Sequence, residues 1–208
     1  RSAGVRSSAA SEVYKRPRDG RSGGGGAGGS VSTVGDAVFE RLLQAGVTHA
    51  VGLPDSVTAP LMARFDAHSD TRWIPVTREG EAFAVAAGLW VGGRTPVVVI
   101  QNTGLLESGD SLRGVAVRMG VPLVTVVTCR GLAGMRGAGW TGSEPPDRSW
   151  LVRADVDSTA LLTEPTLRAW GVPYRLYESP DDVDRIRHTA VAERRPAVLL
   201  IAKQGGAT

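Results

Sequence analysis

The stretch PVVVIQN, residues 96–102, indicates the fold more directly than any other part of the sequence. Its centre, Val97–Ile100, is an unbroken apolar run, which is typical of a strand covered by other elements on both faces. A second run of this kind, PLVTVVTCR at residues 122–130, follows after a segment of helical length. Strands buried on both faces belong mainly to parallel sheets, because their crossover connections place helices above and below the sheet. The two runs therefore predict an α/β fold.

On both sides of these two strands, predicted helices and predicted strands alternate along the sequence. Apolar residues at helical spacing predict helices over residues 33–45, 56–68, 79–93, 105–119, 157–171 and 179–194. Short apolar segments between them predict strands over residues 48–54, 72–77, 96–102, 122–130, 173–178 and 195–203. We expect Pro165 to interrupt its helix, and residues 130–154, rich in Gly, Pro and Arg, to form a loop. The alternation predicts a three-layer, doubly wound, six-stranded parallel sheet of flavodoxin-like type, with right-handed crossovers.

Positive charge is concentrated at the start of the chain. Residues 1–30 hold six basic and two acidic residues, whereas the whole chain of 208 residues has a net charge of only +3. This segment ends in GRSGGGGAGGS, and glycine loses the most conformational freedom on ordering, so we expect a flexible basic extension. A basic arm that docks on an acidic partner is the alternative. We place the domain at residues 31–204 and a short tail at residues 205–208.

The composition also excludes several classes of protein. Beyond residue 30 the chain is slightly acidic, so we expect no nucleic-acid surface. No apolar run approaches the roughly 20 residues of a membrane-spanning helix. The single cysteine, Cys129, excludes an internal disulfide and a zinc site built on several cysteines. With no histidine in the adjacent loops, we expect it to be a packing or pocket-lining residue. Since no apolar segment lies near Arg1, we expect a cytoplasmic protein.

Common phosphate-binding and catalytic motifs are absent from the sequence. It has no GxxxxGK[ST], no GxGxxG between a strand and a helix, and no GxSxG. In a doubly wound sheet, ligands bind beyond the carboxyl ends of the strands, so the informative residues are at positions 54–56, 77–79, 101–104 and 129–131. A purely structural alternative, capping or charging a helix N-terminus, applies to Asp55, Ser56, Glu79, Glu81, Asn102 and Thr103.

Four short motifs occur in one order along the chain. They are LPDS at 53–56, TREGEAFAVAAG at 77–88, VIQNTGL at 99–105 and CRG at 129–131. In this order and spacing the sequence resembles the pyrimidine-binding (PYR) domain of thiamine-diphosphate-dependent enzymes, above all the sulfopyruvate and phosphonopyruvate decarboxylases. The resemblance covers about residues 31–204. It implies the PYR fold and a 2-oxo acid decarboxylase.

The resemblance also implies a role for individual residues. Glu79 would be the catalytic glutamate, which hydrogen-bonds the aminopyrimidine of thiamine diphosphate and activates it. Further residues that would bind the cofactor are Pro54, Asn102, Thr103 and Gly104. Residues that would line the site of a small 2-oxo acid substrate are Asp55, Ser56, Gln101, Arg130 and Arg136. The resemblance implies no metal ligand in this chain.

A partner chain is implied as well. The family holds Mg²⁺ and the diphosphate on a second, pyrophosphate-binding (PP) domain that carries a GDG…N element, and no such element follows the PYR-like region here. The resemblance therefore implies an α-type subunit that works with a separate PP-domain (β) chain, in an α2β2 or larger assembly.

The sequence departs from the family motif at Glu107 and Asp110, which stand where the family has asparagine. Two acids near the site would oppose a sulfonate or phosphonate substrate. A subunit of a thiamine-dependent carboligase in specialised metabolism is therefore the alternative enzyme. A non-catalytic, flavodoxin-like regulatory or scaffold domain is the alternative that is not an enzyme.

Overall fold

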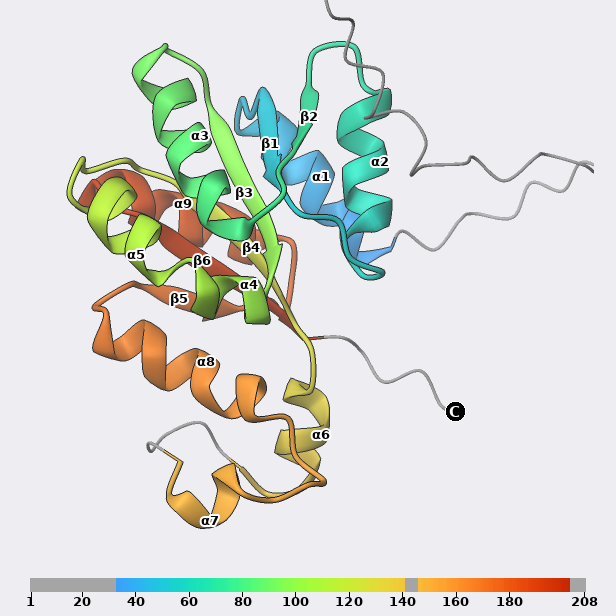
Figure 1. The fold of residues 1–208 in the computed structure, drawn as a ribbon. Coiled ribbons are helices and arrows are strands. Elements are labelled where there is room, and N and C mark those ends of the chain that lie inside the picture. Colours follow the sequence, from blue (N-terminus) through green and yellow to red (C-terminus); the bar gives the residue numbers. More distant parts are fainter. Residues whose placement is uncertain (1–32, 141–145, 203–208) are drawn as a thin grey trace, which may run out of the picture. The chain divides into compact units, whose positions relative to one another are not determined.

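The computed structural model describes residues 33–140 and 146–202 (Figure 1). The expected extension at residues 1–30 and the expected tail at 205–208 lie outside the described residues. Among the described helices, none is both long enough and apolar enough to cross a membrane.

Six parallel strands within the described residues form one sheet, as the sequence predicts. Their order across the sheet is β2-β1-β3-β4-β6-β5, and every neighbouring pair is parallel. The strands are β1 (His49–Gly52), β2 (Arg72–Pro75), β3 (Pro96–Gln101), β4 (Val124–Cys129), β5 (Tyr174–Leu176) and β6 (Ala197–Ala202). The fold class expected from the sequence is therefore confirmed.

The central strand β3 shows why both faces of the sheet are covered. Val98 and Ile100 belong to one hydrophobic cluster, while Val97 and Val99 belong to another, and all four side chains are fully buried. Successive side chains of a strand point to opposite faces, so an unbroken apolar run must have helices on both sides.

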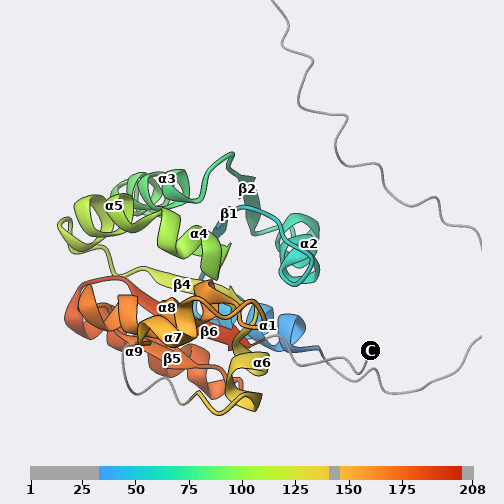
Figure 2. The same ribbon diagram turned by 60° about the horizontal axis from the view of Figure 1, so that its bottom comes forward.

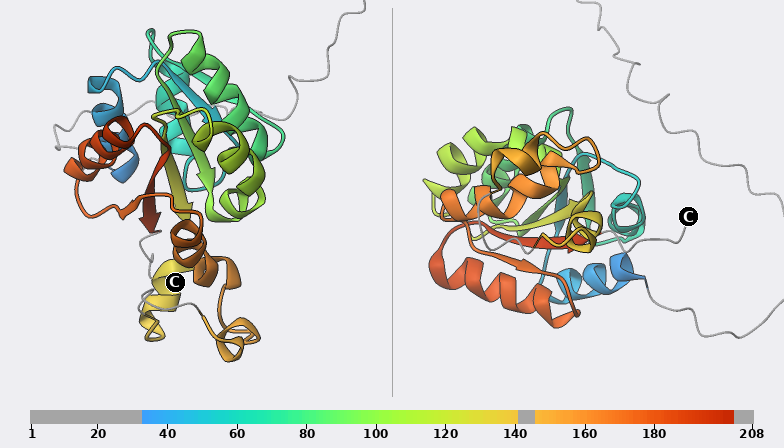
Figure 3. Two further views of the ribbon diagram at one scale, coloured as in Figure 1. Left: turned by 90° about the vertical axis from the view of Figure 1, so that its left-hand side faces the viewer. Right: turned by 90° about the horizontal axis from the view of Figure 1, so that it is seen from below.

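The helices form two layers, one on each face (Figure 3). The first cluster joins the sheet to α3 (Glu79–Val91), α4 (Asn102–Glu107), the π-helical segment η1 (Leu112–Val117), α6 (Leu132–Gly137) and α8 (Ser158–Ala169). The second cluster joins it to α1 (Val34–Gln44), α2 (Ala59–Ala67) and α9 (Asp181–Glu193). The short helices α5 (Gly109–Ser111) and α7 (Arg148–Leu151) pack on α3 and α8, respectively.

Three local predictions are wrong. The helix expected over residues 105–119 is divided into α4, which already begins at Asn102, α5 and the π-helical segment η1. Gly109 lies so close to Trp170 that a Cβ there would be 2.6 Å from the indole ring. The loop expected over residues 130–154 contains α6 and α7 in its described part. Pro165 lies inside α8 without ending it, because α8 packs against α4 and α6 and tertiary contacts outweigh its local cost.

Candidate functional site

The candidate residues gather at the carboxyl edge of the sheet, which comes forward in Figure 2. The segments that hold them follow β1, β2, β3 and β4, and these four strands are neighbours in the sheet. The chain leaves β1 for β2 on one side, while β3 lies on the other side. Doubly wound sheets bind ligands where the strand order reverses in this way. The topology therefore places the four motifs around one point.

Glu79 is the first residue of α3 and is half-buried. Its side chain lies directly against Gly104, in the first turn of α4, where a Cβ would overlap the Cγ and carboxyl group of Glu79. Only glycine lets the two helices approach this closely. The Glu79 carboxylate accepts no hydrogen bond from the part of the chain that the structure describes, so its oxygens are available to a ligand.

Two neighbouring carboxylates are, by contrast, fully engaged. Glu81 accepts a hydrogen bond from the Thr77 backbone N–H at 3.0 Å and one from the Thr77 hydroxyl at 3.0 Å. Glu107 accepts one from the Gly80 backbone N–H at 3.1 Å and forms an ion pair with Arg78. Hydrogen bonds from the Thr77 backbone and hydroxyl lower the pKa of Glu81, and the hydrogen bond from Arg78 lowers the pKa of Glu107. Both are therefore anions, and they stabilise the start of α3 by accepting hydrogen bonds there.

The turn after β1 is held by Asp55. One carboxylate oxygen accepts hydrogen bonds from the backbone N–H groups of Val57 and Thr58, at 2.6 and 2.7 Å. The other accepts the hydroxyl of Thr128, near the end of β4, at 2.7 Å. Asp55 thus stabilises the approach to α2, as its structural alternative predicts. The neighbouring candidates, Pro54 and Ser56, are exposed at the same edge.

The segment after β3 separates into buried and accessible residues. Asn102 is completely buried and donates its amide to the Arg130 carbonyl at 3.0 Å. Its side-chain oxygen has no hydrogen-bond partner among the described residues. Thr103 is exposed and donates its hydroxyl to the half-buried Gln101 side chain at 3.1 Å. Buried polar atoms are rarely left unpaired, so the Asn102 oxygen is a position for a donor from water or a ligand.

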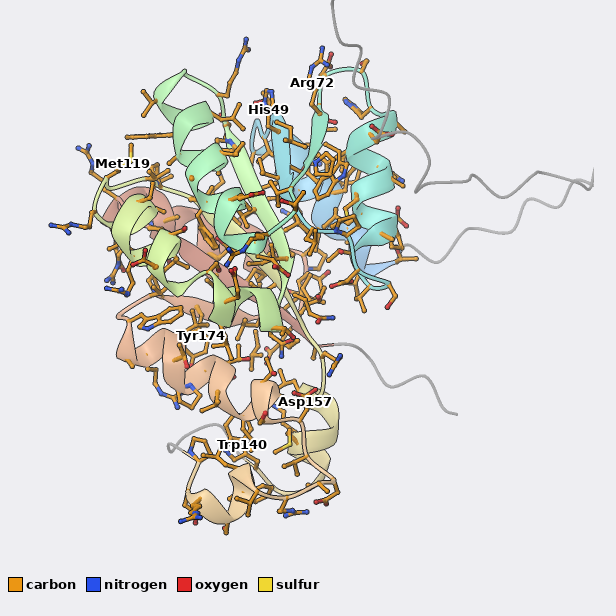
Figure 4. The ribbon with its side chains drawn as sticks, viewed as in Figure 1. His49, Arg72, Met119, Trp140, Asp157 and Tyr174 are labelled. Carbon is orange, nitrogen blue, oxygen red and sulfur yellow. The ribbon has the colours of Figure 1, made fainter. Side chains whose placement is uncertain are left out.

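Arg130 begins the turn after β4, next to Gly131, whose φ of 83° is in the left-handed region. The Arg130 Nε donates to Asp157 at 3.1 Å, and Asp157 itself caps the start of α8 (Figure 4). A Cβ at Gly131 would lie 2.5 Å from the Cβ of Asp157, so the turn fits tightly against α8. The two terminal nitrogens of Arg130 donate no hydrogen bond to described residues. The side chain is 67% exposed and can take an anion there.

Arg136 is not brought together with the other candidates by any contact among the described residues. It lies in α6 and pairs with the buried Glu164 of α8 at 3.4 Å. Burial raises the pKa of Glu164, and burial raises the pKa of the nearby Cys129 thiol to about 12. Cys129 is therefore protonated at neutral pH and acts as a packing residue, as the sequence predicts.

Several residues at this edge escaped the sequence analysis. Asp157 could have been identified, because an Asp directly before Ser-Thr and an apolar run is a helix N-cap signal. Thr128 and Glu164 carry no such signal, since their partners are distant in sequence. The sequence marked Glu107 as a departure from the family motif but not as the partner of Arg78 and Gly80. No group of three or more His, Cys, Asp and Glu side chains in residues 33–140 and 146–202 could hold a metal ion.

Comparisons with known proteins agree with this architecture. Residues 32–148 match the family model for the thiamine pyrophosphate enzyme, N-terminal TPP binding domain. The phosphonopyruvate decarboxylase of Streptomyces viridochromogenes is 40% identical over 89 residues, which is 43% of this chain and 22% of the relative. The sulfopyruvate decarboxylase subunit alpha of Methanothermobacter thermautotrophicus is 33% identical over 99 residues, which is 48% of this chain and 60% of the relative.

A solved structure shares the fold. The thiamine diphosphate-dependent 4-hydroxybenzoylformate decarboxylase of Rhodococcus jostii RHA1 superposes on 82% of this chain, and the match covers 30% of that protein, with a TM-score of 0.57 and 21% identity. The matched parts amount to less than two thirds of the length of these relatives. Because the family model covers more than half of the chain, the protein belongs to the thiamine pyrophosphate enzymes, as an N-terminal TPP binding domain related to phosphonopyruvate and sulfopyruvate decarboxylases.

Proposed function

We propose that this chain is the PYR subunit of a two-chain, thiamine-diphosphate-dependent 2-oxo acid decarboxylase in which Glu79 activates the aminopyrimidine. The proposal is based on the hydrogen bonds that three carboxylates near the start of α3 accept. Glu81 and Glu107 are engaged with the protein, whereas Glu79 accepts no hydrogen bond from any described residue. Glu79 is also the one that lies against α4 at the carboxyl edge of the sheet.

The residues present fit the pyrimidine end of the cofactor. Gly104 leaves room for the Glu79 side chain to lie directly against α4, and the half-buried Glu79 carboxylate accepts no hydrogen bond from described residues, so it can receive a donor from the ring. Thiamine diphosphate, when bound, supplies an acidic ring carbon and a sink for the electrons released on decarboxylation. The part of this chain is to hold the ring and exchange one proton with it through Glu79.

The partner is inferred from an exposed surface as well as from the relatives. The outer face of α3 presents Ala84, Val85, Gly88 and Val91 one or two turns apart, and Val91 is 66% exposed. A contiguous apolar helix face of this kind is typical of a protein interface. The archaeal relatives are named as subunit alpha. We therefore propose a separate PP-domain chain that holds Mg²⁺ and the diphosphate, in an α2β2 or larger assembly.

A small anionic 2-oxo acid suits the charges at this edge. Arg130 offers to a carboxylate two terminal nitrogens that no described residue accepts from. The two acids that depart from the family motif do not oppose it strongly, since Glu107 is paired with Arg78 and Asp110 with Arg113. This arrangement supports an anionic 2-oxo acid as the substrate, for a decarboxylase and for a carboligase alike.

Reconstitution tests the proposal. The full chain is titrated with thiamine diphosphate and Mg²⁺ by calorimetry, first by itself and then mixed with a candidate PP-domain chain. We expect weak binding and no turnover of phosphonopyruvate or sulfopyruvate without the partner, and both tight binding and turnover with it. Tight binding by the chain without the partner would contradict the two-chain arrangement. Turnover that appears only when an aldehyde acceptor is added would identify a carboligase.

A further inference from the structure

The carboxylate of Glu107 contacts the residues on both sides of Glu79. One oxygen accepts the Gly80 backbone N–H at 3.1 Å. The other accepts the Arg78 Nε at 3.2 Å and forms a shorter ion pair with a terminal nitrogen of the same guanidinium. A single side chain from α4 therefore contacts both neighbours of Glu79: the side chain of Arg78, which precedes α3, and the backbone N–H of Gly80.

The same helix also contacts Glu79 itself. Gly104 precedes Glu107 by three residues, so the two lie on one face of α4. Gly104 supports the Glu79 side chain, and Glu107 holds the backbone that carries it. Helix α4 thus grips the start of α3 through three successive residues, the N-cap residue Arg78, Glu79 and Gly80.

These contacts add to the cap of α3. The first N–H groups of a helix have no partner within it. Glu81 accepts the backbone N–H groups of Thr77 and Arg78, just before the helix. Glu107 accepts the Gly80 N–H inside its first turn. Gly80, in the first turn, has the greatest backbone freedom of any residue type. A carboxylate from outside the helix, held near its positive N-terminal end, supplies both the acceptor and a favourable charge.

We propose that Glu107 is a positioning residue, which fixes the Glu79 carboxylate for proton exchange with the ligand that Glu79 binds. This inference rests on the proposed function. Without the grip, the first turn of α3 is free to fray, and the Glu79 carboxylate shifts with it. Displacement of a catalytic group by about 1 Å can cost up to roughly 10²-fold in rate.

Three variants of the full chain test the proposal. Glu107→Ala removes both contacts, whereas Glu107→Gln keeps an acceptor for Gly80 and gives up the ion pair. The matched control is Asp110→Asn, which removes the same charge one turn further on, at a side chain that is 99% exposed and pairs only with Arg113 among the described residues. Hydrogen exchange of the Gly80 amide and the ¹³C carboxyl resonance of Glu79 are measured by NMR on the chain, and kcat and KM on the reconstituted enzyme.

We expect Glu107→Ala to speed exchange at Gly80, to move the Glu79 resonance, and to lower kcat about tenfold or more with KM within about twofold. Glu107→Gln should fall between wild type and Glu107→Ala, and Asp110→Asn should match wild type. Faster exchange at Gly80 with an unmoved Glu79 resonance and unchanged kcat would show that Glu107 only caps the helix, and would overturn the proposal. Should Glu107→Ala fail to fold, the same outcomes are read from Glu107→Gln.

Failure of the proposed function looks different. If Glu79→Gln is as active as wild type while Glu107→Ala still moves the Glu79 resonance, the grip exists but Glu79 is not the catalytic group. If the resonance and the Gly80 exchange are unaffected by either Glu107 variant, the grip itself is absent.

Discussion

Gly104→Ala should displace the Glu79 carboxylate without unfolding the protein. A Cβ at position 104 would overlap the Cγ and carboxyl carbon of Glu79. Restoring an ordinary carbon–carbon contact of about 3.5–4 Å requires the Glu79 side chain to move by more than about 1 Å. Since the side chain is half-buried, it can turn outward to do so.

The expected magnitudes follow from this movement. Alanine gains about 1 kcal/mol of helix propensity over glycine, and an off-rotamer Glu79 costs about 1 kcal/mol, so the melting temperature should change little. Misplacing the carboxylate by about 1 Å should lower kcat roughly 10²-fold, or about 2.7 kcal/mol of barrier.

Steady-state kinetics of the reconstituted enzyme and thermal unfolding of the chain measure the two effects. The matched control is Gly134→Ala, another helical glycine, around which an added Cβ would meet no atom within 4 Å. This control should keep wild-type kcat. If Gly104→Ala also keeps wild-type kcat, the contact between α4 and Glu79 has no catalytic importance and the reasoning is refuted.

Three further predictions concern other residues of this edge. Arg130→Ala should raise KM more than it lowers kcat, since its two terminal nitrogens, unpaired among the described residues, would bind the substrate acid group. An unchanged KM would make Arg130 a surface residue paired with Asp157. Burial raises the pKa of Glu164, so the folded state binds an extra proton between the unfolded and folded pKa values, and stability falls as pH rises through that window. Glu81, Glu107 and other carboxylates with lowered pKa values stabilise the folded chain as pH rises, so the test compares two proteins. Between pH 4 and pH 7, urea unfolding should show a less favourable change in stability for wild type than for Glu164→Gln, and equal changes would show that Glu164 has no part in it. Cys129, with its pKa raised to about 12, should react with iodoacetamide at pH 7.5 far more slowly in the folded chain than in urea. Equal rates would show that the Cys129 thiol is not buried in the folded chain.

The sequence was sufficient to predict the sheet and the edge where the candidates meet. Unbroken apolar runs such as Val97–Ile100 require cover on both faces, and parallel strands bring their carboxyl ends together. The placement of Glu79 at the start of α3 could also be predicted, because the strand pattern at residues 72–77 ends just before the helical pattern that begins at residue 79.

The contacts that hold the site could not be predicted in this way. The bond between Arg78 and Glu107 spans 29 positions in sequence, and the bond between Asn102 and Arg130 spans 28. Helical or strand periodicity reports only the local backbone and the buried face, so it gives no information on which side chains meet across helices. The approach of Gly109 to Trp170, 61 positions later, is another contact of this kind.

The role of Glu79 is the central claim, and hydrogen–deuterium exchange at C2 of bound thiamine diphosphate tests it most directly. Glu79→Gln keeps the shape of the side chain and one acceptor oxygen but cannot exchange a proton with the aminopyrimidine. In the reconstituted enzyme we expect the exchange rate to fall about 10²-fold or more, with assembly and melting temperature unchanged. Equal exchange rates in wild type and Glu79→Gln would contradict the account and leave Glu79 as a carboxylate that only stabilises the start of α3.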